Sequence, residues 1–329
     1  MPVLAALCGP AAGAGLPWTK VADVPLPGST ARFDYQAVDP SSHRLFISHM
    51  GAGTVVVFDL NGRHVTAALD GFPGATGITV DPGAHRAFVS VTGGWLASLA
   101  GGGKLAALDT GTLKTVWMVP AGRFPDGSAI AQGKLYVSDE SGEQELVFDE
   151  ASGRKIAAIP LGGEAGMTAF NARDGRIYVN VQTRRELAAI DPHSDGIVAE
   201  YPLPADCDNN HGLLIEPSGG RAFIACDGNA TLLIFDVADK KMIGHFSTGA
   251  EPDVLALDSG RGLLYVAAES GVVSVFDVSA AGAGSKIGEE FAGGNAHSIA
   301  VDENTGLVYL PLRDAGGHPV LRIMQFKKP

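Results

Sequence analysis

An apolar–aromatic–apolar triplet recurs along the chain, and its spacing constrains the fold more than any other feature. The seven copies are Leu45-Phe46-Ile47, Ala87-Phe88-Val89, Leu135-Tyr136-Val137, Ile177-Tyr178-Val179, Ala222-Phe223-Ile224, Leu264-Tyr265-Val266 and Val308-Tyr309-Leu310. Their central aromatic residues lie 42, 48, 42, 45, 42 and 44 residues apart. A period of about 40–45 residues with several short strands in each repeat is typical of β-propeller blades. The sequence therefore predicts an all-β, seven-bladed β-propeller.

The first repeat shows how one blade is built. Short strands are expected over residues 35–38, 44–48, 54–60 and 64–69, with Asn61-Gly62 forming the last turn. Four antiparallel strands per repeat make a blade whose first strand lines the central channel. The third strand of six repeats ends on an aspartate, which can accept hydrogen bonds from the backbone of the following turn. These aspartates are Asp59, Asp109, Asp149, Asp191, Asp236 and Asp277, and their repetition indicates a role in the scaffold.

The ends of the chain predict how the ring closes. The chain stops just after the third strand of the seventh repeat, while residues 18–26 have strand character and belong to no repeat. We expect them to supply the outer strand of the last blade, which removes an exposed sheet edge. Residues 16–329 then form a single propeller domain, and a closed ring without long unpaired strands favours a monomer.

Charge and the N-terminal composition bear on location and partners. The net charge is −12 and no Lys/Arg run exceeds a pair, so nucleic acid is not an expected partner. Residues 1–15 are mostly small and apolar and end near Ala12-Gly13-Ala14, which fits the remnant of a secretory signal peptide. The alternative is a disordered extension. No other stretch approaches the ~18 apolar residues of a membrane span. These features predict a periplasmic or secreted protein without a transmembrane segment.

Two cysteines remain beyond the signal-like segment. Cys207 precedes the first strand of the fifth repeat and Cys226 ends the second. Antiparallel pairing of these strands would bring the two residues together, and an even number of cysteines in an exported chain favours a disulfide. Free buried thiols and metal ligands are the alternatives.

The repeats resemble those of the YVTN-type (WD40-like) β-propeller family of exported bacterial proteins. The resemblance rests on Tyr178-Val179-Asn180, Tyr136-Val137-Ser138 and Tyr265-Val266-Ala267, with their Asp-Pro and Phe-Asp companions. It covers the chain from about residue 18 onwards. It implies the propeller fold and an exported binding or scaffold protein, while the motif residues themselves are structural.

Polar residues that break the repeat mark a candidate site at one end of the channel. The residue twelve positions before each aromatic enters an innermost strand, with Asp126 as the equivalent in the third repeat. The ring reads Asp34, Thr76, Asp126, Gly166, His211, Asp253 and His297. Its carboxylates and imidazoles could bind a polar ligand or a divalent metal such as Zn, Mn, Fe or Ca. The metal ligands would be His211, His297, Asp34 and Asp253; alternatively, these side chains only bind water and loop backbone.

Neighbouring loops add candidate ligand-binding residues. Asn210 lies beside His211, and Arg123 could hold an anionic group. Trp95 lies in the glycine-rich insertion at residues 92–104, where it could act as a lid or simply pack on the adjacent blade.

The first functional hypothesis is an exported binding or scaffold protein that recognises a small molecule or a partner protein at the loop face. The alternative is a metal-dependent lyase or hydrolase (lactonase-like) in which one carboxylate is the general base. A third is an electron-transfer partner of an exported oxidoreductase. No nucleophile elbow, phosphate-binding loop or haem-attachment motif occurs in the sequence.

Overall fold

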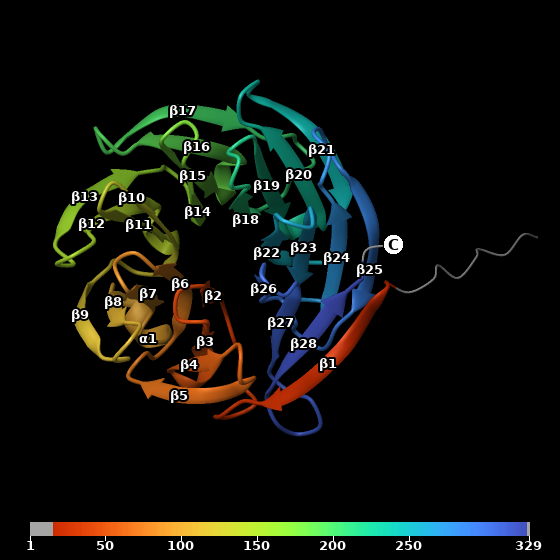
Figure 1. Ribbon diagram of the computed structural model, residues 1–329. Helices are drawn as coiled ribbons and strands as arrows, with labels where there is room; N and C mark the ends of the chain where they lie inside the picture. Colours follow the sequence, from red (N-terminus) through yellow and green to blue (C-terminus); the bar gives the residue numbers. More distant parts are fainter. Residues whose placement is uncertain (1–15, 328–329) are drawn as a thin grey trace, which may run out of the picture.

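The computed structural model describes residues 16–327, which form seven four-stranded antiparallel sheets arranged as blades in a ring (Figure 1). The first strand of each blade lies nearest the centre, and the fourth lies at the outer edge. The predicted all-β, seven-bladed propeller is therefore confirmed. Among these residues, no helix is long and apolar enough to cross a membrane.

Each blade consists of four strands that are consecutive in the sequence, except the last blade, which combines the final three strands with β1. Blade one contains β2 (Gln36–Asp39), β3 (Arg44–His49), β4 (Thr54–Asp59) and β5 (His64–Asp70). Blade two contains β6 (Ala75–Asp81), β7 (Arg86–Val91), β8 (Lys104–Asp109) and β9 (Thr115–Pro120). Blade three contains β10 (Pro125–Ala131), β11 (Lys134–Asp139), β12 (Gln144–Asp149) and β13 (Lys155–Pro160). Blade four contains β14 (Ala165–Asn171), β15 (Arg176–Val181), β16 (Glu186–Asp191) and β17 (Gly196–Pro202).

The remaining strands follow the same order. Blade five contains β18 (Asn210–Ile215), β19 (Arg221–Cys226), β20 (Thr231–Asp236) and β21 (Lys241–Ser247). Blade six contains β22 (Pro252–Asp258), β23 (Leu263–Ala268), β24 (Val272–Asp277) and β25 (Ser285–Phe291). Blade seven contains β26 (Ala300–Asp302), β27 (Leu307–Leu312), β28 (Val320–Phe326) and β1 (Trp18–Pro25).

The N-terminal strand closes the ring as the sequence predicts. β1 pairs antiparallel with β28, from Trp18 opposite Phe326 to Pro25 opposite Val320, and Figure 1 shows the red and blue strands side by side. Arg322 reinforces this seam by donating two hydrogen bonds, of 2.8 and 2.7 Å, to the carboxylate of Asp23. These hydrogen bonds lower the pKa of Asp23 to about 2. The first and last parts of the chain are thus held in one sheet.

The repeated residues serve the scaffold. All seven triplet aromatics are fully buried, because the second strand of each blade carries its apolar face into the core between blades. The predicted turn role of the strand-three aspartates is also confirmed. Asp149, for example, accepts a 2.9 Å hydrogen bond from the backbone N–H of Ser152, and equivalent bonds reach Asp59, Asp109, Asp191, Asp236 and Asp277.

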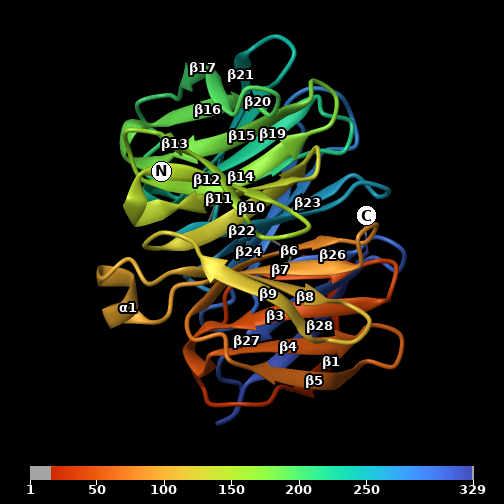
Figure 2. The same ribbon diagram turned by 90° about the vertical axis from the view of Figure 1, so that its left-hand side faces the viewer.

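The insertion in blade two is not only a glycine-rich loop. It contains a short helix, α1 (Trp95–Leu99), which projects from one face of the ring (Figure 2). Gly93 and Gly94, with φ of 79° and 83°, turn the chain into this helix. Leu96 and Leu99 are 73% and 67% exposed. Trp95 begins α1, but its side chain lies outside what the structure describes, so its role as a lid stays a prediction.

Candidate functional site

The two cysteines are joined, which confirms the predicted disulfide. Cys207 and Cys226 are bonded with their Cα atoms 5.3 Å apart, and both are fully buried. Cys226 ends β19 opposite Asn210, the first residue of β18. The bridge therefore fixes the loop that leads into β18, and with it the residue that follows Asn210, His211.

A cavity of about 400 Å³ lies where the innermost strands begin. Its lining is dominated by seven carboxyl side chains, against a single arginine and a single histidine. The lining residues are Arg32, Asp34, Tyr35, Met50, Phe124, Asp126, Glu140, Gln182, Asn209, His211, Asp227, Glu251, Asp253 and Glu269. We call this cavity the acidic mouth. The structure thus brings four predicted residues into one cavity: Asp34, Asp126, His211 and Asp253.

A second ring of lining residues was not singled out in the sequence. Four positions after the triplet aromatic, the chain leaves the second strand of the blade, usually in a short 3-10 turn. These turns are η1 (Met50–Ala52), η2 (Glu140–Gly142), η3 (Gln182–Arg184) and η4 (Asp227–Asn229). Their first residues and Glu269 all line the acidic mouth. The sequence contains a signal for this second ring, because the residue four positions after the aromatic differs between repeats, as the first ring of residues does.

His211 lies at the centre of a hydrogen-bonded group. Its Nε2 is 3.0 Å from the Tyr35 hydroxyl, which in turn donates a 3.2 Å hydrogen bond to Asp253 Oδ1. Its Nδ1 is 3.3 Å from Gln182 Oε1, an acceptor. Since the Tyr35 proton goes to Asp253, both imidazole nitrogens face acceptors. This arrangement suits a doubly protonated His211.

Nearby charges favour the same protonation state. Burial alone would lower the pKa of His211, but the negative charges of Asp253, Asp126 and Glu140 outweigh burial and raise it. His211 Nε2 lies 3.4 Å from Asp253 Oδ1 and 3.7 Å from Asp126 Oδ2. The protonated form of His211 is therefore favoured by its position between Asp126 and Asp253.

His297 has a different environment, although it occupies the same ring position in blade seven. It is only 1% exposed, and its Nδ1 lies 3.2 Å from the backbone oxygen of Asn295. Its Nε2 has no hydrogen-bond partner among residues 16–327 and lies 3.9 Å from Asp253 Oδ2. Burial lowers the pKa of His297 despite the charge of Asp253. His297 is therefore a neutral imidazole beneath the acidic mouth.

The carboxyl groups are crowded and poorly compensated. Burial, followed by the charge of Asp126, raises the pKa of Asp34 well above its usual range. Burial also raises the pKa of Asp126 to about 7. Arg32 forms an ion pair with Glu269, and its closest approach to Asp253 is 3.8 Å. Even with Asp34 and Asp126 protonated, the remaining carboxylates outnumber Arg32 and His211.

Other predicted site residues lie outside this cavity. Asn210 is fully buried in the wall, where its amide donates to Asn180 Oδ1 and Glu186 O at 3.1 and 3.0 Å. Arg123 is exposed and lines a separate surface hollow beside Asp139. The Thr76 hydroxyl donates to Pro125 O, at 2.7 Å, and so joins two blades. These three positions serve the wall or the outer surface rather than the acidic mouth.

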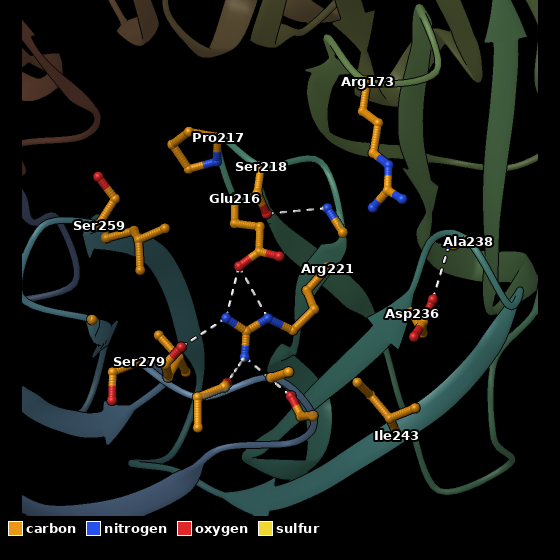
Figure 3. Close-up of a pocket in the computed structure, with 17 residues that line it drawn as sticks. Arg173, Glu216, Pro217, Ser218, Arg221, Asp236, Ala238, Ile243, Ser259 and Ser279 are labelled. Carbon is orange, nitrogen blue, oxygen red and sulfur yellow. Dashed lines mark hydrogen bonds and ion pairs between the residues drawn. The ribbon is translucent and has the colours of Figure 1, made fainter.

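Of two further cavities, one lies at the opposite face of the ring and the other adjoins the acidic mouth. An apolar one of about 600 Å³ shares Arg32, Met50 and Phe124 with it and extends below α1 to Thr92 and Ser98. Another, of about 470 Å³, lies at the opposite ends of the strands between blades five and six (Figure 3).

The arginine at the centre of the cavity in Figure 3 is already paired. There the Arg221 guanidinium is held by Glu216 and by the backbone oxygens of Val278, Ala280 and Gly282. This arginine is used to join the two blades. The acidic mouth is accordingly the better candidate for a binding site.

Comparison with known proteins supports the fold alone. The chain is similar to the β-propeller domain of Cps50 (Swd1) from Myceliophteria thermophila, with 12% identity and a TM-score of 0.76, over 94% of this chain and 100% of that one. It is also similar to a chain of the mitotic checkpoint complex, with 10% identity and a TM-score of 0.76, over 94% and 96% of the two chains. No protein-family model and no curated protein matches the sequence. The likeness establishes a WD40-like propeller, whereas the YVTN-type resemblance stays a prediction.

The raised pKa of Asp126 predicts an unusual pH dependence of stability. The folded state holds this proton up to about pH 7, whereas the unfolded chain releases it near the usual aspartate pKa of 3.8. Stability is therefore lost as the pH rises between these values. Asp126→Asn should remove that loss and raise the free energy of unfolding at pH 8 by on the order of 2 kcal/mol, with little change at pH 4.

Urea denaturation of both proteins from pH 4 to pH 8 measures this effect. Asp70→Asn, at an exposed position at the end of β5, is the control and should leave the profile unchanged. If Asp126→Asn destabilised the protein at pH 8 as much as at pH 4, the buried carboxylate would be making a favourable contact that we have not identified.

Proposed function

We propose that this propeller is a binding protein that holds a small molecule bearing positive charge in the acidic mouth. The observation that carries the proposal is the excess of carboxyl groups over cationic groups in one cavity of about 400 Å³. Such a volume is within the range of small-molecule sites, about 300–1,000 Å³. Low-dielectric walls strengthen the attraction between these carboxylates and a cation. A ligand with ammonium groups suits this lining better than an anion.

The lining suggests how such a ligand would sit. Glu140, Asp227 and Glu251 are not paired with Arg32 and would receive the ammonium groups. The aromatic rings of Phe124 and Tyr35 would add cation–π contact. Because Met50 and Phe124 also line the apolar cavity below α1, the carbon skeleton of the ligand would extend that way.

We also propose that the protein works in the periplasm or outside the cell. The Cys207–Cys226 disulfide supports this location, since disulfides persist in oxidising compartments. The resemblance to exported YVTN-type propellers points the same way. A basic segment of an exported partner protein would meet the same carboxylates, and it is a second possible ligand of this surface.

Thermal denaturation in the presence of matched cations and anions tests the proposal. Butylamine, putrescine and spermidine are compared with butyrate and succinate at pH 7.5. We expect at least one amine to raise the melting temperature, by an amount that corresponds to about 2.7 kcal/mol at one hundred times its Kd. The anions should have no such effect.

Charge-neutralised variants locate the binding. Glu140→Gln/Asp227→Asn should abolish the amine effect, because both residues line the mouth. The control pair, Glu143→Gln/Asp70→Asn, removes two exposed carboxylates outside the cavity and should retain it. Stabilisation by the anions instead of the amines would overturn the proposal.

The alternative function is a metal-dependent lyase or hydrolase acting on lactone-like substrates. It is favoured by the position of His211 between Asp126 and Asp253, where a raised carboxyl pKa near neutrality suits a general base. A screen of lactones with added Mn²⁺ or Zn²⁺ tests it. Turnover that Asp126→Asn abolishes would support an enzyme, and the absence of turnover would leave the binding function.

A further inference from the structure

We propose that Asp34, Asp253 and His297 bind one divalent metal ion at the base of the acidic mouth. The inference rests on the proposed function, because it names the cation that this part of the mouth takes. One ligand atom from each residue lies within 4.8 Å of the other two. All three residues are buried, with exposures of 5%, 7% and 1%. They come from blades one, six and seven, which are neighbours in the ring.

The strongest observation is the buried nitrogen of His297. A neutral imidazole carries one N–H, and here Nδ1–H donates it to the backbone oxygen of Asn295. Nε2 is then left with a free lone pair, and it has no partner among residues 16–327. Native proteins rarely leave a buried polar atom unpaired. A histidine whose second nitrogen is held by a carbonyl is the usual arrangement at a metal site.

Asp34 supplies an independent observation. Asp34 is only 5% exposed and lines the acidic mouth, and no residue among 16–327 donates a hydrogen bond to its carboxyl group. The backbone N–H of Asp34 donates a 2.9 Å hydrogen bond to the backbone oxygen of Ser48, which fixes Asp34 at the entrance of β2. An ionised carboxyl group in this position is costly unless a proton or a bound cation neutralises it. The space between Asp34 and His297 is where that cation would lie.

Asp253 is oriented by its neighbours to complete the set. Its Oδ1 accepts the Tyr35 hydroxyl and faces His211. Its Oδ2 faces His297 Nε2 at 3.9 Å. Oδ1 of Asp253 is therefore held by a hydrogen bond, whereas Oδ2 accepts none from residues 16–327 and lies between His297 Nε2 and Arg32 Nη2, which is 3.8 Å away. His211, which the sequence also indicated as a ligand, is outside the three-residue set and instead fixes Asp253.

Arg32 does not replace the metal ion. Its guanidinium forms an ion pair with Glu269 and comes no closer than 3.8 Å to Asp253. The positive charge of Arg32 also acts on Asp34 and His297, but no hydrogen bond joins its guanidinium to Asp34 or Asp253. The carboxyl oxygens of Asp34 and Asp253 thus keep the lone pairs that a divalent cation needs. Two carboxylates and one imidazole favour Mn²⁺, Zn²⁺ or Fe²⁺ over Ca²⁺, which prefers an all-oxygen site. Water or the bound ligand would complete the coordination.

Metal binding by the full chain tests the proposal. Protein freed of metal by a chelator is titrated calorimetrically with Mn²⁺, Zn²⁺ and Ca²⁺, and uptake is counted by inductively coupled plasma mass spectrometry. We expect one Mn²⁺ or Zn²⁺ per chain and weaker binding of Ca²⁺. Asp34→Asn, which is nearly isosteric, should weaken binding at least 100-fold. Asp70→Asn, at an exposed position outside the cavity, should retain it.

Two further readouts separate metal binding from folding. The metal-free Asp34→Asn variant should melt no lower than the metal-free wild type, because asparagine is nearly isosteric with a carboxyl group whose uncharged form burial already favours. It should, however, no longer gain stability from metal. In pulsed electron paramagnetic resonance, the bound Mn²⁺ should show nitrogen coupling that disappears in His297→Gln.

Two results would overturn the metal site: no uptake by the wild type, or equal affinity in wild type and Asp34→Asn. If amines still stabilise the protein in that case, the proposed function survives and only the metal site is wrong. If neither amines nor metals bind, both fail together.

Discussion

A chain that begins at Leu26, and so lacks β1, is expected to lose the cooperative monomeric fold. β1 covers β28 over its whole length, and its removal exposes a row of unpaired backbone groups along that edge. Arg322 would lose its partner Asp23, and the buried side chain of Phe326 would lose its cover. We expect the free energy of unfolding to fall by more than about 5 kcal/mol, which is as much as many domains possess.

Thermal denaturation followed by circular dichroism, together with size-exclusion chromatography, measures the loss. A synthetic peptide of residues 16–26, added in trans, should restore part of the stability if pairing with β28 is the cause. A peptide with the same composition in scrambled order is the control. A truncated chain that stays monomeric and melts at the wild-type temperature would show that β1 is not part of the closed ring.

Replacing both cysteines, Cys207→Ser/Cys226→Ser, is expected to lower the free energy of unfolding by about 3 kcal/mol. The disulfide closes a segment of 19 residues, and the unfolded chain gains that conformational freedom when the bond is absent. For a chain of this size the change corresponds to a drop of about 5 °C in Tm. The variant should also bind amines more weakly, because the disulfide no longer holds the loop that carries Asn209 into the acidic mouth.

Urea denaturation of the oxidised wild type, the reduced wild type and the variant measures this effect. The reduced wild type should match the variant, since both lack the covalent link. Cys207→Ala/Cys226→Ala controls for burying a serine hydroxyl in a fully buried site. Equal urea midpoints for oxidised and reduced protein would contradict the stabilising role.

The architecture was predictable because it depends on short sequence patterns that recur in the repeats. The aromatic triplet buries one residue between blades in every repeat, and the aspartate that ends each third strand accepts hydrogen bonds within its own turn. Both effects depend on neighbours along the chain. Closure by β1 followed from counting strands, since the last repeat lacked a fourth. The helix α1 was missed because five residues among glycines carry no helical period.

The candidate site was predictable only in part. Counting back from the triplet aromatic found residues that enter the innermost strands, and four of those residues line one cavity. Counting forward by four residues finds Glu140, Asp227 and Glu269, but only the positions before the aromatic were compared between repeats. Alternation along β18 also separates neighbours, because Asn210 points into the wall while His211 lines the cavity.

Distances across the ring could not be read from the sequence. Spacing along the chain places His211 and His297 at equivalent positions, yet the two imidazoles face opposite oxygens of Asp253. The difference arises because β26 begins at Ala300, three residues after His297, whereas His211 is already within β18. His297 is therefore held by the backbone of its own loop, at Asn295.

The measurement that tests the central claim most directly is anomalous diffraction from crystals soaked separately in manganese chloride and in sodium bromide. Our account predicts a manganese peak in the acidic mouth, adjacent to Asp34, Asp253 and His297, and no bromide there. A bromide peak in the mouth, with manganese confined to carboxylates on the outer surface, would contradict the account, because it would show that the cavity attracts anions despite its carboxyl lining.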